Sequence, residues 1–198
     1  MSQNNLAIIL SGGTGTRFDT KLPKQFHRLN DKYIIEISVN KFLETKLFQK
    51  IVVVSSLEYF DITKKILNFK NVEIVLGGKT RQGSAYNALR ESKKYKIENV
   101  LIHDAARPLV SISLIKKITK GIQRLKCLVP SINVNDSLRK VDRQYKDINR
   151  ENVKIIQTPQ AFKFIEIMKA HEKFKYDNLT DDSIILAKNG IKINQIKG

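Results

Sequence analysis

The stretch LAIILSGGTGTR, residues 6–17, decides the fold class of this 198-residue chain. Its apolar run leads straight into a glycine-rich loop, which is typical of a buried parallel strand that ends beside a ligand. Glycines there let the backbone approach a ligand closely and direct its N–H groups inward. The loop has neither the Gly-Lys-Ser/Thr ending of a Walker A motif nor the GxGxxG spacing of dinucleotide-binding proteins. Alone, it is as compatible with a structural turn as with phosphate binding.

Apolar runs alternate with segments of helical period after this strand, and together they predict a doubly wound, mainly parallel α/β sheet. The polar residues 134–157 interrupt the pattern with short alternating pieces, and we interpret them as a β-arm. No repeat or linker appears, so a single domain is expected over residues 1–198. The further strands are expected at 51–54, 72–76, 100–103, 127–132 and 191–196, and the helices at 34–43, 60–67, 84–92, 113–124, 162–174 and 182–189.

Composition narrows the class of partner. The net charge of +17 suggests an anionic partner, but the lysines are scattered in pairs such as Lys64-Lys65 on amphipathic stretches, as on solvated helix faces. Nucleic acid is therefore a weaker hypothesis than small phosphorylated ligands, since the aromatic residues fall inside apolar periods. Cys127 is the only cysteine, which excludes an internal disulfide and argues against a Cys-based zinc site. Without an apolar run long enough for a membrane span or a signal peptide, we expect no membrane partner and a cytoplasmic location.

Two cations follow the glycine loop. Arg17 closes the loop, and Lys24 stands within Pro23-Lys24-Gln25. Two cations beside a cradle of N–H groups are what a triphosphate requires, because charge develops on the phosphorus while pyrophosphate leaves.

Two further motifs follow expected strands. His103-Asp104-Ala105-Ala106-Arg107-Pro108 follows the strand at 100–103, where Asp104 could hold a metal ion or serve as a turn or cap residue. Residues 77–84, GGKTRQGS, open the helix at 84–92, and Ser84 could contact a ligand or cap that helix. From the residues alone, both alternatives stay open at each motif.

The combination of Gly12-Gly13-x-Gly15-x-Arg17, Pro23-Lys24-Gln25, the hexad 103–108 and Thr158-Pro159-Gln160 resembles the 2-C-methyl-D-erythritol 4-phosphate cytidylyltransferase family. The glycine loop and PKQ resemble the ribitol-5-phosphate cytidylyltransferases equally well, so ribitol 5-phosphate is the alternative acceptor. The resemblance implies magnesium-dependent transfer of CMP from CTP to a polyol phosphate, with release of pyrophosphate. It also implies a homodimer in which the arm crosses to the second subunit.

The same resemblance assigns roles to individual residues. Arg17 and Lys24 would be the catalytic cations, and Asp104 would bind Mg²⁺. It places the nucleotide against Gly12, Gly13, Thr14, Gly15, Gly78, Arg81, Ser84 and Ala105. It places the acceptor against Arg107, Ser137, Arg150 and Thr180.

One departure concerns the end of the sequence at Gly198. Members of the resembled family continue with an Asn-x-Lys-Ile-Thr segment that supplies a phosphate-binding lysine. We therefore expect these 198 residues to bind CTP and to turn over slowly. An inactive nucleotide-binding domain is the rival hypothesis.

Overall fold

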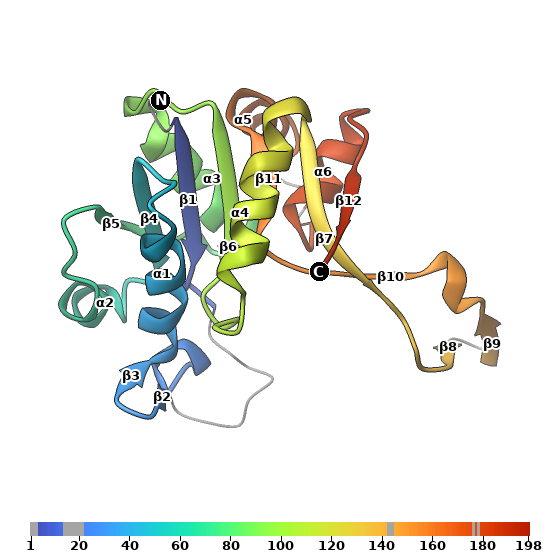
Figure 1. Ribbon diagram of the computed structural model, residues 1–198, viewed down its shortest axis with the longest axis horizontal. Helices are drawn as coiled ribbons and strands as arrows, with labels where there is room; N and C mark the ends of the chain where they lie inside the picture. The colour runs from blue at the N-terminus through green and yellow to red at the C-terminus, as the bar shows by residue number, and fades with distance from the viewer. Residues whose placement is uncertain (1–3, 14–21, 142–144, 176, 178) are drawn as a thin grey trace.

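Four parallel strands form one half of a central sheet (Figure 1). Strand β1 (Asn5–Leu10) lies between β4 (Lys50–Ser55) and β6 (Asn99–Asp104), and β5 (Val72–Leu76) forms the edge. These strands confirm the parallel sheet expected from the apolar runs. The computed structural model describes residues 4–13, 22–141, 145–175, 177 and 179–198.

The other half of the sheet is mixed. Strand β11 (Gln160–Lys163) runs antiparallel to both β6 and β7 (Cys127–Asn133), and it separates the two. Strand β10 (Lys154–Ile156) pairs antiparallel with β7, while β12 (Asn194–Lys197) pairs with it in parallel. The order is β10-β7-β11-β6-β1-β4-β5, with β12 attached to β7.

Helices cover both faces of the sheet. One face carries α1 (Ile34–Thr45) and α4 (Ile112–Gly121), and the other carries α3 (Arg81–Glu91), α5 (Phe164–Lys173) and α6 (Asp182–Lys188). The short helix α2 (Phe60–Ile66) packs beside the edge strand β5. Two small strands, β2 (Arg28–Leu29) and β3 (Lys32–Tyr33), form a hairpin before α1.

The side chains of β1 show why a continuous apolar run indicates a strand with helices on both faces of the sheet. All of its residues are buried. Leu6, Ile8 and Leu10 pack into the core on the α3 and α5 side, whereas Ala7 and Ile9 pack on the α1 and α4 side. Alternate side chains point to opposite faces, so a strand with helices on both faces has no polar face.

Two of the expected boundaries in the second half of the chain were wrong. Phe162 was assigned to a helix over 162–174, but it lies in β11, and α5 begins at Phe164. The last strand was expected at 191–196, whereas β12 begins only at Asn194.

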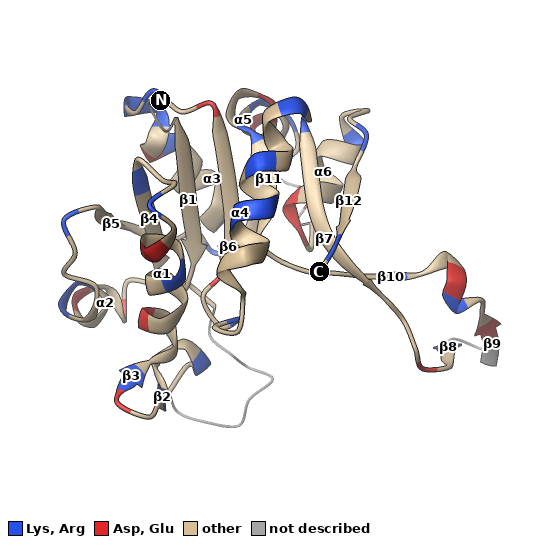
Figure 2. Cartoon of the chain, viewed as in Figure 1, with Lys and Arg blue, Asp and Glu red and all other residues tan. Residues whose placement is uncertain are grey.

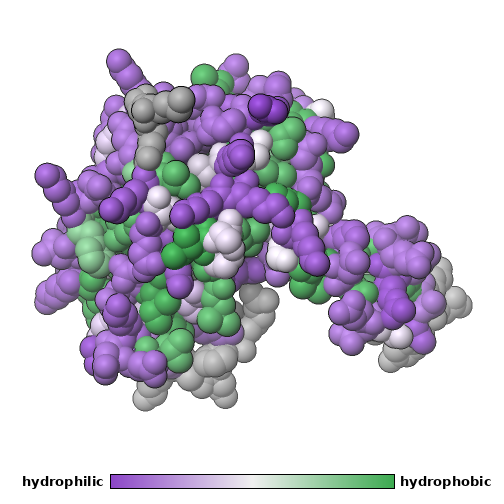
Figure 3. All heavy atoms as spheres, in the orientation of Figure 1, coloured by the Kyte–Doolittle hydropathy of each residue, from purple (hydrophilic) through white to green (hydrophobic). Residues whose placement is uncertain are grey.

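The polar excursion leaves the body of the molecule as an arm. Its tip is an antiparallel hairpin of β8 (Leu138–Val141) and β9 (Tyr145–Ile148), followed by the single turn η4 (Arg150–Asn152). Figure 1 shows this arm projecting beyond the edge of the sheet, and its visible surface is mainly hydrophilic in Figure 3.

Charged side chains are spread over the surface rather than gathered in one stripe. In Figure 2, Lys and Arg appear on several helices and on the arm, with acidic residues between them. This distribution agrees with lysines that solvate helix faces. In the described part of the chain, no helix combines the length and the apolar character that a membrane crossing requires.

Candidate active site

A pocket of about 620 Å³ lies at the carboxyl ends of the parallel strands. Leu10 and Asp104 are register partners at the ends of β1 and β6, so the glycine loop and the HDAARP motif emerge side by side. This edge is where open α/β sheets bind ligands. The pocket is lined by Leu10, Gly12, Gly13, Lys24, Gln25, Gly78, Lys79, Thr80, Arg81, Ser84, Asp104, Ala106, Arg107 and Thr180.

The PKQ motif fastens the glycine loop to the pocket. The buried Gln25 side chain donates from Nε2 to the carbonyl oxygens of Ser11, at 2.7 Å, and Gly13, at 3.1 Å. Lys24 precedes it in a short helical turn and lines the same pocket. Gln25 had no expected role, although its place beside Lys24 was a usable signal.

Part of the expected phosphate cradle lies outside the described residues. Thr14, Gly15 and the expected catalytic cation Arg17 belong to that segment. Gly12 and Gly13 are described, and both line the pocket.

A second turn, between β5 and α3, forms the opposite wall. Thr80 is the N-cap of α3, and its Oγ1 accepts from the Gly83 N–H at 3.0 Å. The Ser84 hydroxyl accepts from the Gly78 N–H at 3.1 Å and lies 3.3 Å from the Gly78 carbonyl oxygen. The expected helix start near Ser84 was therefore wrong, since α3 begins at Arg81, and Ser84 braces the turn from inside the helix.

The backbone of this turn is closely packed. A Cβ atom on Gly78 would lie 2.8 Å from the carbonyl carbon of Gly83, which is closer than backbone atoms allow. Gly78 therefore keeps the turn tight, and Gly78 itself borders the pocket.

Ionic contacts connect the two walls. Asp104 Oδ1 lies 3.4 Å from Arg81 Nη2, and its Oδ2 lies 3.2 Å from Arg107 Nε. On its other side, Arg81 donates from Nη1 to Asp182 Oδ2 at 2.7 Å. The Asp104 side chain is 28% exposed, so a ligand in the pocket can reach its carboxylate.

His103 is a structural residue beneath this network. It is fully buried, and burial lowers its pKa from 6.5 to about 4, so it is neutral at physiological pH. Its Nε2 donates to the Arg107 carbonyl oxygen at 3.1 Å, because a carbonyl can only accept. Its Nδ1 then accepts from the Thr158 hydroxyl at 2.8 Å. The histidine thus supports the turn that carries Arg107.

Ala105 does not border the pocket, contrary to the expected contact with the nucleotide. It is buried among the core residues of the α1 side, its N–H donates to Leu10, and its carbonyl accepts from Ser38 Oγ at 2.6 Å. Ala106 lines the pocket instead.

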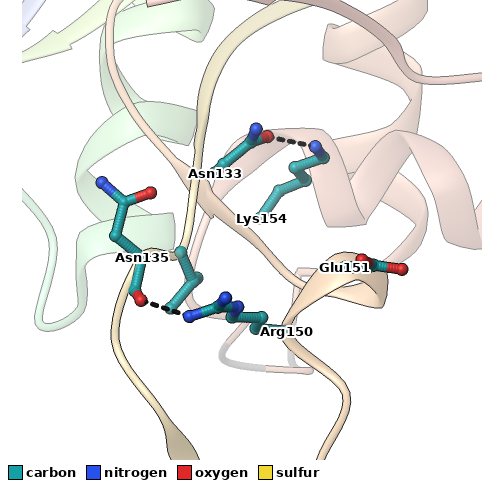
Figure 4. A pocket seen from close by; sticks show the side chains of 6 residues that line it. Asn133, Asn135, Arg150, Glu151 and Lys154 are labelled. Atoms are coloured by element: carbon teal, nitrogen blue, oxygen red, sulfur yellow. Dashed lines mark hydrogen bonds between the residues drawn. The ribbon is translucent and has the colours of Figure 1, made fainter.

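The expected acceptor residues fall into two groups. Arg107 and Thr180 line the main pocket. Ser137 is exposed on the arm, and Arg150 lines a separate cavity of about 490 Å³ within the arm (Figure 4). There Arg150 donates from Nη1 to the Asn135 carbonyl at 2.7 Å. Within this subunit, Arg150 is therefore not part of the pocket that contains Lys24.

The pocket offers a metal ion one carboxylate. In the described ranges, no group of three or more His, Cys, Asp or Glu side chains could hold a metal by itself. A single acidic ligand beside a phosphate site fits Mg²⁺, which is usually bound through one or two carboxylates, substrate phosphates and water. Asp104 is the residue that would hold it.

Comparisons with known proteins identify a family model and several similar enzymes. The chain matches the family "IspD: 2-C-methyl-D-erythritol 4-phosphate cytidylyltransferase" over residues 6–198. It is 36% identical to that enzyme from Thermosipho africanus, with 98% of this chain and 88% of the relative aligned. It is 38% identical to the bifunctional enzyme IspD/IspF of Pelagibacter ubique over 98% of this chain, which spans only 52% of that protein.

Solved structures show the same fold. The 4-diphosphocytidyl-2C-methyl-D-erythritol synthase of Anaerococcus prevotii superposes with a TM-score of 0.86 at 27% identity, covering 98% of this chain and 86% of that one. The bifunctional IspDF of Campylobacter jejuni gives a TM-score of 0.86 at 34% identity, covering 98% of this chain and 49% of that one. Because the family match covers almost the whole sequence and the motifs converge on one pocket, the chain belongs to the 2-C-methyl-D-erythritol 4-phosphate cytidylyltransferase family.

Proposed function

We propose that this protein transfers a cytidylyl group from CTP to 2-C-methyl-D-erythritol 4-phosphate and releases pyrophosphate, a step of isoprenoid precursor synthesis. The observation that carries the proposal is the convergence of the glycine loop, Lys24 and Asp104 on one pocket at the sheet edge. Backbone donors, a cation and an acid within one cavity match the needs of a nucleoside triphosphate.

In this reaction, a phosphate oxygen of the acceptor attacks the α-phosphorus of CTP in line with the leaving group. The new P–O bond forms as the bond to the bridging oxygen of the β-phosphate breaks, and no covalent enzyme intermediate is required. The Lys24 ammonium stabilises the charge that builds on the phosphoryl oxygens, and Arg17 is proposed for the same task. A divalent cation, for which we propose Mg²⁺ on Asp104, would neutralise phosphate charge.

The two walls of the pocket divide the substrate between them. We assign the triphosphate to Gly12, Gly13 and Lys24, and the cytidine to the turn that carries Gly78 and Ser84. The acceptor is assigned to the side of Arg107 and Thr180. The arm residues Ser137 and Arg150 would complete the acceptor site of a second subunit in a homodimer.

The compartment that we propose is the cytoplasm. The only cysteine, Cys127, is free and buried, and burial raises the pKa of its thiol to about 12. A thiol of this kind is unreactive and is in keeping with a reducing environment.

An acceptor panel tests the proposed function. Pyrophosphate release is measured with CTP and either 2-C-methyl-D-erythritol 4-phosphate or D-ribitol 5-phosphate, with UTP as the control nucleotide. We expect turnover with CTP and the methylerythritol phosphate. Preference for ribitol phosphate would replace the acceptor, and CTP binding without turnover on either acceptor would leave only a nucleotide-binding domain.

A further inference from the structure

A buried acid and a buried histidine lie behind the pocket, and the proposed reaction does not use either directly. Asp182 begins α6 and His171 lies in the last turn of α5, and both side chains are 0% exposed. His171 Nε2 donates to Asp182 Oδ1 at 3.1 Å. Burying a carboxylate is costly unless it is paired, so this one requires a partner.

That partner is Arg81, which reaches into the pocket. The Arg81 Nη1 to Asp182 Oδ2 distance is 2.7 Å, whereas Nε and Nη2 are each 3.4 Å from Asp104 Oδ1. The buried carboxylate therefore makes the closer contact, and the pocket-facing carboxylate makes the looser one. Burial alone would raise the pKa of Asp182, but Arg81 and the bond from His171 hold it below the ordinary 3.8. Asp182 is therefore ionised and holds the guanidinium.

His171 fixes the rotation of the Asp182 carboxylate. It occupies Oδ1 and leaves Oδ2 for Arg81, while the Tyr86 ring stacks on the imidazole at 6.4 Å between centroids. Its Nδ1 has no hydrogen-bond partner among the described residues. The imidazole therefore makes its polar contact with Asp182 alone, which points to a dedicated orienting role.

We propose that Asp182 and His171 are positioning residues for cytidylyl transfer: they draw the Arg81 guanidinium away from Asp104 Oδ1, which leaves that oxygen open to a divalent cation and Arg81 aimed at the substrate. The other oxygen, Oδ2, keeps its contact with Arg107. This inference rests on the proposed function. Without Asp182, Arg81 would have only Asp104 as a carboxylate partner within this network, and it would compete with the cation for that side chain. The buried pair would thus act on the reaction through Arg81.

The test compares Asp182→Asn with Glu172→Gln. Asn retains the shape of the side chain and removes its charge. Glu172 is the residue after His171, and its carboxylate forms an exposed ion pair with Lys93 at 2.9 Å, so its substitution removes a nearby charge without reaching the pocket. We expect Asp182→Asn to lower kcat/KM for CTP by roughly 10²-fold, as for a misplaced group, and to raise the Mg²⁺ concentration needed for half-maximal rate several-fold. The control should stay within about twofold of the parent, because exposed ion pairs contribute little.

A double-mutant cycle separates positioning from a general loss of stability. If Asp182 acts through Arg81, Arg81→Ala combined with Asp182→Asn should be no slower than Arg81→Ala alone, to within about twofold. Calorimetric CTP binding at fixed Mg²⁺ provides a readout independent of turnover and should show the same pattern. Urea unfolding shows whether each variant is folded. If Asp182→Asn is not folded, His171→Gln replaces it in the cycle.

The outcomes distinguish this inference from the proposed function. An active parent whose Asp182→Asn variant behaves like Glu172→Gln, or a double variant with additive losses, would overturn the positioning role alone. A parent that releases no pyrophosphate overturns the proposed function, and the calorimetric cycle then decides the positioning role by itself. Equal CTP affinity in all the folded variants would contradict the positioning role.

Discussion

Lys24 owes its place in the pocket to its two neighbours. Pro23 fixes the backbone before it at φ −58°, and Gln25 after it is tied to the glycine loop. We expect Lys24→Ala to lower turnover by roughly 10²–10³, as for the loss of one preorganised group that stabilises developing charge. Lys32→Ala, on the exposed small hairpin, is the matched control. Steady-state kinetics decide the point, and a Lys24 variant within threefold of the parent removes the catalytic role.

Asp104 is the second residue on which the site depends. Asp104→Asn conserves size and removes the charge that a divalent cation requires, so the Mg²⁺ titration of the rate should shift to higher concentration and the maximum should fall. The same substitution weakens the contacts to Arg81 and Arg107, which are 30% and 49% exposed. An unchanged titration would reduce Asp104 to a partner of these two arginines.

At the level of elements, strands β10 and β11 connect the arm to the candidate active site. Both strands pair antiparallel with β7. Thr158 lies between these strands, where it satisfies His103 Nδ1 and also accepts from the Asp104 N–H at 3.4 Å. Thr158→Val keeps the shape and leaves the buried imidazole unpaired, which should cost about 1–3 kcal/mol of unfolding free energy. Urea denaturation measures this loss. Thr119→Val is the control, since that hydroxyl only adds a bond to the Ile115 carbonyl one helical turn earlier, and an equal loss there would contradict the argument.

The strands also show which parts of the fold could be predicted from the sequence. The buried parallel strands were predictable, because a strand covered on both faces needs an unbroken apolar run, as in β1. Strand β11 was not, because QAFK passes directly into α5 without a turn residue, and Phe162 fits the helical period of the segment that follows. Local periodicity cannot show that a strand is inserted between β6 and β7, since that pairing depends on distant residues.

The candidate site also contains residues that the sequence could predict and residues that it could not. Residues that directly follow strands, such as Gly12 and Asp104, were predictable as neighbours, because parallel strands place their carboxyl ends along one edge. The buried support was not predictable in the same manner. His171 acts through its contact with Asp182, and a lone histidine on a helix carries no spacing signal. Gln25 differs from it, because it directly follows Lys24 in the sequence.

At the scale of the whole molecule, the arm projects away from the body of the subunit (Figure 1). Arg150 lies in the turn η4 of this arm and lines a different cavity from the pocket of Lys24. If the arm completes the site of a second copy, Arg150→Ala should raise the KM for the acceptor much more than the KM for CTP. Arg139→Ala, which removes an exposed ion pair with Asp147 on the same arm, is the control. A selective effect of the control, or none from Arg150→Ala, would exclude this role for Arg150.

Mixing experiments extend the same prediction. Combining Arg150→Ala with Lys24→Ala protein should restore part of the activity, because one mixed dimer contains one site with both residues intact. Sedimentation at micromolar concentration measures the assembly independently, and a monomer there would remove the basis for complementation.

The close packing at Gly78 and Gly83 has a consequence for which sequences this fold can accept. A side chain on Gly78 meets main-chain atoms at 2.8 Å, whereas a Cβ on Gly83 would first meet the Thr80 hydroxyl at 3.3 Å. The main chain cannot move locally to relieve such a contact. The Thr80 hydroxyl can shift by a few tenths of an ångström when its side chain rotates. A saturation library selected for isoprenoid-dependent growth should therefore retain only glycine at 78 and admit alanine at 83. Enrichment of alanine at both codons would show that the turn is more plastic than its contacts indicate.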